Sequence, residues 1–237
     1  MGFECEIRTD VGLRRKLNED SVIGLPEKGL FVVADGMGGH EAGEVASAMV
    51  VEAMDRLAPE GDAAKLVENA VAALHEVNAA LIEMGRSGLE VRTIGTTVVG
   101  IALGQGKYRC FWAGDSRAYR VHAGNIEQIS RDHSLVQDLI AAGMLEPADA
   151  ESHPNANVIT RAVGAAEDLR VDVVEGDTVS GDIFLLASDG LTRVVTQVEL
   201  LAALYSKPLG EAADHLLKMV LSRGAPDNVS MALVKVP

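Results

Sequence analysis

Several apolar runs in this sequence end in the same way, at an aspartate followed by a small residue. Residues 30–36 read LFVVADG, residues 110–116 read CFWAGDS, and residues 183–190 read IFLLASDG. Apolar runs of this length, bounded by turn-forming residues, are typical of buried β-strands. The run SMALVKV at 230–236 instead follows an aspartate, Asp227. A strand opposite in direction to the others brings its first residue to the edge where they finish, so the runs predict antiparallel sheet with carboxylates along one edge.

The remaining elements come in groups of strands and groups of helices rather than in strict alternation, which favours an α+β fold. Asp62–Met84 has apolar side chains three and four residues apart, the pattern of an amphipathic helix. Ala123-Gly124-Asn125 is typical of a hairpin turn. The expected strands are Ser21–Leu25, Leu30–Ala34, Thr96–Leu103, Tyr108–Ala113, Ala118–His122, Leu169–Val174, Ile183–Ala187 and Ser230–Val236. The other expected helices are Glu41–Leu57, Leu135–Ala142, Val198–Leu204 and Leu209–Leu221.

The composition disfavours several classes of protein. The 237 residues include 35 acidic and 21 basic side chains, a net charge of −14, whereas nucleic-acid binding relies on clustered Lys and Arg. Two cysteines, Cys5 and Cys110, are too few for a disulfide framework and fit a reducing cytoplasm. The sequence shows neither a secretory signal pattern nor an apolar run as long as a membrane helix. We therefore expect a single cytoplasmic domain over residues 1–237, monomeric, with neither nucleic acid nor membrane as a partner.

The expected edge of carboxylates has a chemical use. Clustered carboxylates repel one another and raise one another's pKa, so cations stabilise such a cluster. Oxygen ligands select hard ions such as Mg²⁺ and Mn²⁺, and two such ions can activate a shared water for attack on phosphorus. Near the N-terminus, the basic run 14–16 precedes the acidic pair Glu19-Asp20. An arginine there can bind phosphate oxygens and the acids can order metal-bound water, with Arg14 and Arg15 as alternatives for the phosphate-binding role.

Motifs spread over nearly the whole chain resemble, in order, those of the metal-dependent Ser/Thr protein phosphatases of the PPM, or type 2C, family, and most closely its bacterial branch. The motifs are TDVGLRRKLNEDS (9–21), FVVADGMGGHEAGEVAS (31–47), GTTVV (95–99), GDSRAYR (114–120), SRDHSLV (130–136), NVITRAVG (157–164), LLASDGL (185–191) and PDNVSMALV (226–234). The resemblance implies a four-layer α-β-β-α sandwich of two antiparallel sheets flanked by helices. It also implies a flap subdomain at approximately 138–166 and a cleft that binds two Mn²⁺ or Mg²⁺ ions.

The resemblance also implies the metal ligands of this cleft. Asp35 would bridge both ions, and the carbonyl oxygen of Gly36 would bind one of them. Asp189 and Asp227 would complete the coordination of the other ion. These roles are carried over position by position from the family's motifs.

Further residues would act around the ions. Glu19 and Asp20 would act through metal-bound water, and the spacing to Asp20 makes Arg15 rather than Arg14 the expected phosphate clamp. The implied reaction is hydrolysis of phosphoserine and phosphothreonine by direct attack of water, without a phosphoenzyme. Phosphorylated proteins and a cognate Ser/Thr kinase are the implied partners.

Two departures from the family pattern bear on this interpretation. A third metal is often held in the family by an aspartate at the position of Asp115 and by a second aspartate where this chain has Arg193. Either that third site is weak or absent, or Arg193 lies elsewhere and binds substrate. An exposed arginine at the start of a helix, with no role at the site, is the alternative to both. His40 is a candidate general acid because an imidazole titrates near neutrality, with a structural or surface histidine as the alternative. His133 is expected to be structural.

Two other functions remain open on the sequence alone. Arg193 motivates the first, a pseudophosphatase or phosphoprotein-binding module with little turnover. The second is a phosphomonoesterase that acts on small metabolites. The irregular segment Gly143–Asn157 is interpreted either as a flap that selects substrates or as a plain connecting loop.

Overall fold

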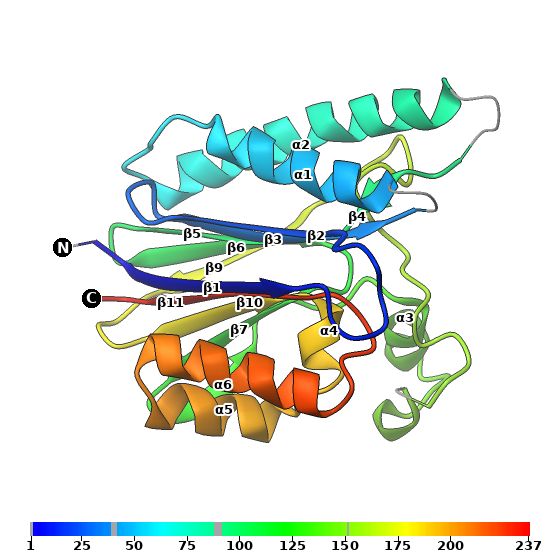
Figure 1. Cartoon of the computed structure of the whole chain (residues 1–237). Helices are drawn as coiled ribbons and strands as arrows, with labels where there is room; N and C mark the ends of the chain where they lie inside the picture. The colour runs from blue at the N-terminus through cyan, green and yellow to red at the C-terminus, as the bar shows by residue number, and fades with distance from the viewer. Residues whose placement is uncertain (1, 39–41, 88–91, 151) are drawn as a thin grey trace.

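Two antiparallel sheets stack face to face between two pairs of helices, with both chain ends at the same side of the sandwich (Figure 1). The structure is a computed structural model and describes residues 2–38, 42–87, 92–150 and 152–237. The α+β class and the four-layer sandwich predicted above are confirmed. No helix in these described ranges combines the length and the apolar character that a membrane crossing requires.

Every strand pair within the two sheets is antiparallel. One sheet has the order β2-β3-β5-β6-β9, with β4 paired to β3, and the other has the order β1-β11-β10-β7-β8. The first sheet contains β2 (Asp20–Leu25), β3 (Leu30–Met37), β4 (Gly95–Thr96), β5 (Val98–Gly104), β6 (Lys107–Ala113) and β9 (Asp172–Asp177). The second contains β1 (Glu4–Asp10), β7 (Arg117–His122), β8 (Asn125–Gln128), β10 (Ile183–Ala187) and β11 (Val229–Lys235).

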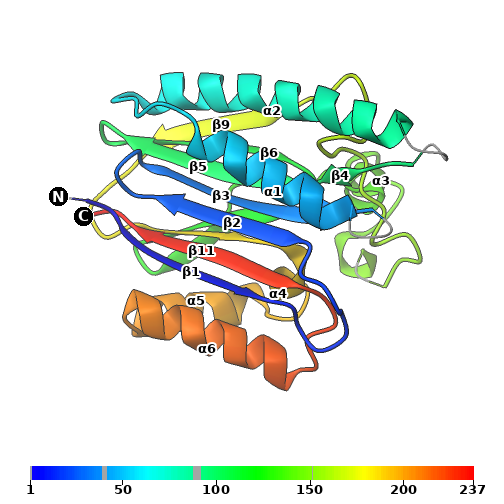
Figure 2. The same ribbon diagram turned by 45° about the horizontal axis from the view of Figure 1, so that its top comes forward.

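The helices cover the outer faces of the two sheets (Figure 2). Helices α1 (Ala42–Asp55) and α2 (Ala63–Arg86) pack on the first sheet, and α5 (Gln197–Ser206) and α6 (Leu209–Ser222) pack on the second. Capping residues determine where α2 and α5 begin. Asp62 accepts a hydrogen bond from the Ala64 amide at the start of α2, and Thr196 forms a capping box with Glu199 at the start of α5. The shorter helices are α3 (Leu135–Ala141), α4 (Asp189–Thr192) and the 3₁₀ turn η1 (Pro147–Asp149).

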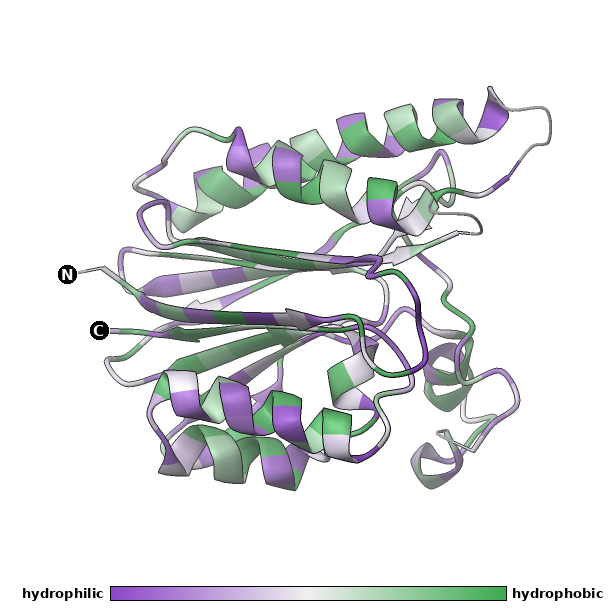
Figure 3. Cartoon of the chain, in the orientation of Figure 1, coloured by the Kyte–Doolittle hydropathy of each residue, from purple (hydrophilic) through white to green (hydrophobic). Residues whose placement is uncertain are grey.

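The continuous apolar runs are explained by strands that are buried on both faces. Along β3, Leu30 and Val32 face the layer of α1 and α2, whereas Phe31 and Val33 face the opposite sheet, and all four side chains are fully buried. Because successive side chains of a strand point to opposite faces, both faces need apolar residues here. Apolar residues accordingly run along the strands of both sheets, while the outer helices carry both polar and apolar residues (Figure 3).

Some elements differ from the sequence-based expectation. Strand β1, with the sequence ECEIRTD, was not predicted, because an edge strand with one polar face lacks the apolar run that marks the others. The strand expected over Thr96–Leu103 is divided at Thr97, whose amide bonds to the Asp35 carbonyl oxygen at 2.8 Å. The strand expected from Leu169 begins instead at Asp172. The division at Thr97 joins β5 to the end of β3, where the candidate site lies.

Candidate active site

The aspartates that end or precede the apolar strands gather at one end of the sandwich. Asp35, near the end of β3, has Asp20, Asp189, Asp115 and Asp227 as its charged neighbours. Asp20 pairs directly with Asp35 across β2 and β3. Asp189 follows β10 and Asp227 precedes β11, so the antiparallel pairing of these two strands brings both to one edge. The structure thus brings together the carboxylates that the strand pattern singled out.

Burial and mutual repulsion perturb these carboxyl groups. Burial raises the pKa of Asp35 well above its ordinary value, and the charges of Asp20 and Asp189 raise it further. Burial also raises the pKa of Asp20 to about 7, although a hydrogen bond from Ser188 works in the opposite direction. The pKa of Asp189 is likewise raised by burial, against the lowering effect of Arg193. Positive charge at this edge would stabilise the ionised carboxylates.

The donor atoms fit a hard divalent cation better than any other ligand. The converging groups are carboxylate oxygens, and Gly36 follows Asp35 directly in β3. Among the residues that the structure describes, no three His, Cys, Asp or Glu side chains converge closely enough to hold an ion by themselves. An ion here would therefore also take carbonyl or water oxygens, which Mn²⁺ and Mg²⁺ accept readily.

A close approach between two glycines fixes the geometry around Glu19. The Gly36 amide donates to the Glu19 carbonyl oxygen at 3.1 Å. A Cβ atom on Gly36 would lie 2.1 Å from the Gly43 carbonyl oxygen, and one on Gly43 would lie 2.5 Å from Oε1 of Glu19. Only glycine at both positions allows α1 to pack this tightly on the end of β3. Sequence reasoning missed Gly43, although it stands within the quoted motif at 31–47.

The structure places Arg15, rather than Arg14, against the carboxylates. Nη2 of Arg15 donates to Oδ2 of Asp227 at 2.8 Å, and the Arg15 side chain stays half exposed. Asn228 holds the loop that carries Arg15, because its Nδ2 donates to the carbonyl oxygens of Val11 and Leu17, each at 2.9 Å. An exposed guanidinium beside the carboxylates is available to bind a phosphate group.

Small polar side chains support the carboxylates from behind, and the sequence analysis did not single them out. Ser188 Oγ donates to Oδ2 of Asp20 at 2.9 Å and accepts from the Ser230 amide at 3.0 Å. Thr97 Oγ1 accepts from the Asp35 amide at 3.2 Å. The sequence could have indicated them only through their positions, because each lies beside an aspartate or within a quoted motif.

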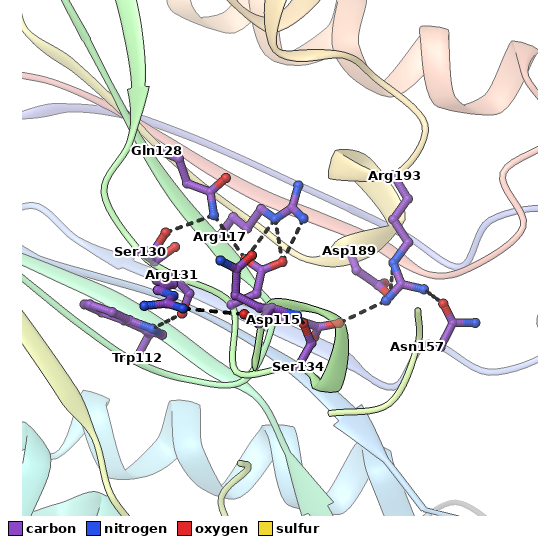
Figure 4. A network of polar contacts seen from close by, with 12 residues as sticks. Trp112, Asp115, Arg117, Gln128, Ser130, Arg131, Ser134, Asn157, Asp189 and Arg193 are labelled. Atoms are coloured by element: carbon purple, nitrogen blue, oxygen red, sulfur yellow. Dashed lines mark hydrogen bonds and ion pairs between the residues drawn. The ribbon is translucent and has the colours of Figure 1, made fainter. Parts of the chain in front are cut away.

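Arg193 lies at the same edge and contacts residues from three segments (Figure 4). Its Nη2 is 3.0 Å from Oδ2 of Asp115 and its Nε is 3.1 Å from Oδ2 of Asp189. Its Nη1 donates to the side-chain oxygen of Asn157. Burial raises the pKa of Asp115 to about 6, and Arg193 acts in the opposite direction. Arg193 therefore points into the acidic cluster. Its effect on a third metal ion and on substrate binding stays a prediction.

The two histidines considered from the sequence have different outcomes. His40 lies outside the described residues. His133 is buried, and its Nδ1 accepts a hydrogen bond from the Gly114 amide at 3.1 Å while its Nε2 lies 3.2 Å from Oδ2 of Asp172. Burial lowers the pKa of His133, which favours the neutral ring. These contacts support a structural role for His133.

Comparison with known proteins agrees with the fold. The family model described as protein phosphatase 2C matches residues 14–236. The chain is 35% identical over 241 residues to the serine/threonine phosphatase stp of Listeria monocytogenes, covering 98% of this chain and 96% of that protein. The chain therefore belongs to the protein phosphatase 2C family, whose members are metal-dependent.

Two further relatives define the family context. The chain is 36% identical over 232 residues to the serine/threonine protein phosphatase PstP of Mycobacterium tuberculosis, covering 97% of this chain but 44% of that protein's length. It is also similar to the solved catalytic domain of PstP in complex with two manganese ions. That structure is 32% identical, with a TM-score of 0.88 and with 100% of this chain and 99% of the other covered.

Proposed function

We propose that this chain hydrolyses phosphoserine and phosphothreonine in proteins by direct attack of water, using two Mn²⁺ or Mg²⁺ ions. The observation that carries the proposal is the gathering of Asp20, Asp189 and Asp227 around Asp35, with Arg15 beside them. The similarity over nearly the full length to serine/threonine phosphatases supports the same reaction. When bound, the two ions would acidify a shared water and neutralise the phosphate.

Each side chain has a defined part in this proposal. Asp35, the Gly36 carbonyl, Asp189 and Asp227 would hold the ions. Because Oδ2 of Asp20 accepts from Ser188 and the Glu19 amide donates to Asn228 Oδ1 at 2.9 Å, both acids are held in place to orient water. The candidate general acid, His40, lies outside the described residues.

Arg15 binds the phosphate of the substrate in this proposal. Its guanidinium presents a planar fork that matches two phosphate oxygens. Its present partner, Asp227, is one of the proposed metal ligands, so an ion at Asp227 and a phosphate at Arg15 would neutralise both partners of the ion pair. Arg15 would then orient the phosphorus toward the attacking water.

The proposal extends to partners, location and organisation. The substrates are phosphorylated proteins, and a cognate Ser/Thr kinase supplies the phosphate that this chain removes. We propose that the chain acts in the cytoplasm as a monomer, formed by one catalytic domain over 1–237 with a flap at approximately 138–166. Residues 138–166 contain the end of α3 and η1, and their remaining described part lacks α-helix or extended strand.

The test is hydrolysis of a phosphothreonine peptide by metal-stripped protein titrated separately with Mn²⁺ and Mg²⁺, with Asp35→Asn in parallel. We expect activity to rise with metal and to disappear in the variant. Binding of the peptide without turnover at any metal concentration would instead identify a phosphoprotein-binding module. Faster turnover of small phosphate esters than of several phosphopeptides would identify a phosphomonoesterase.

A further inference from the structure

Asp115 is a buried carboxylate whose charge is balanced by one arginine. Its side chain is 6% exposed, its Oδ2 lies 3.0 Å from Nη2 of Arg193, and its Oδ1 is buried without a hydrogen-bond partner among the described residues. An ionised carboxylate in such a place needs a positive charge close by. Arg193 supplies that charge from a side chain that cannot lose its proton.

The same guanidinium also neutralises a second carboxylate. Asp189 and Arg193 stand four residues apart across α4, and Nε of Arg193 lies 3.1 Å from Oδ2 of Asp189. The helix therefore directs Arg193 back onto the residue that begins it. One cation thus lies between Asp115 and Asp189, two carboxylates that a metal ion would otherwise attract.

The third contact of Arg193 reaches the segment 143–157, called here the 143–157 loop. Nη1 of Arg193 donates to Oδ1 of Asn157, across 36 residues of sequence. The other hydrogen bonds of the described part of this loop stay within it or join it to the residues that flank it, α3 on one side and Val158 on the other. Among these described contacts, the bond to Arg193 alone ties the loop to the sandwich.

A cavity of about 270 Å³ lies between this loop and the acidic edge. Ala150, Ala156 and Asn157 line it from the loop, and Asp115, Thr192 and Arg193 line it from the sandwich. Its volume lies just below the usual range of ligand pockets, about 300–1,000 Å³. The position of Asn157 therefore shapes one wall of a pocket beside the proposed reaction centre.

We propose that Arg193 is a positioning residue that acts as a tethered cation: it neutralises Asp115 and Asp189 in place of a further metal ion, and it fastens the 143–157 loop to the acidic edge through Asn157. The first half rests on the proposed function, since it concerns metal binding at this edge. The second half depends only on the fold. Together they make Arg193 the link between the charge of the site and the shape of the adjacent pocket.

Metal stoichiometry tests the first half. Equilibrium dialysis against Mn²⁺ with elemental analysis is expected to give one more ion per chain for Arg193→Met than for the wild type. Arg193→Lys keeps a positive charge and should keep the wild-type number. The double variant Asp115→Asn/Arg193→Met should lose the additional ion, and circular dichroism verifies that each variant is folded. An unchanged number of ions in Arg193→Met would overturn the tethered-cation role.

Proteolysis of the loop tests the second half without metal. Asp149 lies exposed in the loop, so a protease that cleaves on the N-terminal side of aspartate, followed by mass spectrometry, reports cleavage at this position. Asn157→Ala and Arg193→Met are expected to be cleaved there about tenfold faster than the wild type, the change in open population that loss of one charge-assisted hydrogen bond produces. Asn155→Ala is the matched control, because its side chain forms no hydrogen bond in the described part of the chain.

Kinetics with a phosphopeptide distinguish positioning from a general loss of structure. Asn157→Ala leaves the ion pairs of Arg193 in place, so KM should rise several-fold while kcat stays close to the wild-type value. Equal cleavage of the loop in Asn157→Ala and wild type would refute the fastening role. A wild-type protein that binds no Mn²⁺ would contradict the proposed function, and the cleavage experiment would still decide the second half.

Discussion

Asp20 and Asp35 lie directly opposite each other where β2 pairs with β3. Residues opposite each other in an antiparallel pair share one face of the sheet, where like charges destabilise the pair. Burial is the main reason that the pKa of each carboxyl group is raised, and the charge of each neighbouring carboxylate adds to the effect. The folded chain therefore carries a local electrostatic cost that divalent cations would relieve.

Asp35→Asn should stabilise the metal-free protein. Removing the charge opposite Asp20 is expected to raise stability by about 1 kcal/mol, or roughly 2–4 °C in Tm for a chain of this size. The same variant should lose the Mn²⁺-dependent rise in Tm, because ligand binding stabilises only a fold that binds the ligand. Thermal unfolding in chelator and in Mn²⁺ measures both effects. An equal Mn²⁺-induced shift in wild type and variant would remove Asp35 from the metal site.

Arg15→Ala should impair the reaction far more than Arg14→Ala. Arg15 lies 2.8 Å from Asp227, whereas Arg14 is an exposed neighbour in the same basic run. Loss of a charge-assisted contact to phosphate is expected to lower kcat/KM by about 10- to 100-fold. Steady-state kinetics on a phosphothreonine peptide measure the loss, and Arg14→Ala serves as the control for charge alone. Similar losses in both variants would show that the basic run acts only through its overall charge.

Gly100→Ala should destabilise the first sheet. Gly100 pairs with Phe111 across β5 and β6, and a Cβ atom on Gly100 would lie 2.2 Å from Cζ of the fully buried Phe111 ring. Overpacking of this kind costs about 1–3 kcal/mol. Urea unfolding measures the change, and Gly61→Ala is the control because no atom lies within 4 Å of its added Cβ. Phe111→Leu in the Gly100→Ala background should recover part of the loss.

Much of the fold was predictable because its central strands, such as β3, β5, β10 and β11, are buried on both faces. The apolar runs that end at Asp35, Asp115 and Asp189 mark such strands directly, and their shared ending indicated one edge of the sheet. The edge strand β1 was not predictable in this way, since one of its faces is polar. The four-residue helix α4 is too short to produce a periodic pattern.

The metal-ligand candidates were predictable, but the contacts that hold them were not. Asp35 and Asp189 follow strong local signals, whereas Ser188 supports Asp20 from 168 residues away and Arg193 meets Asn157 across 36 residues. Such contacts depend on how β10, the loop and α4 meet in space, and no spacing along the sequence encodes them. The resemblance to a family indicated that Arg193 was unusual without indicating what it contacts.

A polar network far from the candidate site is expected to control acid stability. Asp182 is 2% exposed, and its carboxylate accepts from Arg120 at 2.6 Å, from the Val179 amide at 3.1 Å and contacts Nδ1 of His122 at 2.7 Å. Burial raises the pKa of Asp182, but these hydrogen bonds outweigh it and hold the pKa below its ordinary value. A depressed carboxyl pKa means that the folded state favours the ionised form.

Asp182→Asn should therefore destabilise the protein mainly at neutral pH. The loss is expected to be about 3 kcal/mol near pH 7, because Arg120 would be left without its buried partner. Since the folded pKa is lowered, the stabilisation is present above the unfolded pKa, near 4, and is lost as pH falls through the folded pKa. Unfolding curves of wild type and variant should thus converge below about pH 4.

Asp168→Asn is the control for an exposed ion pair. It breaks the pair with Arg170 and should cost less than about 1 kcal/mol at any pH. A difference between wild type and Asp182→Asn that stays constant from pH 7 to about pH 3 would show that the side chain contributes through packing rather than through its charge.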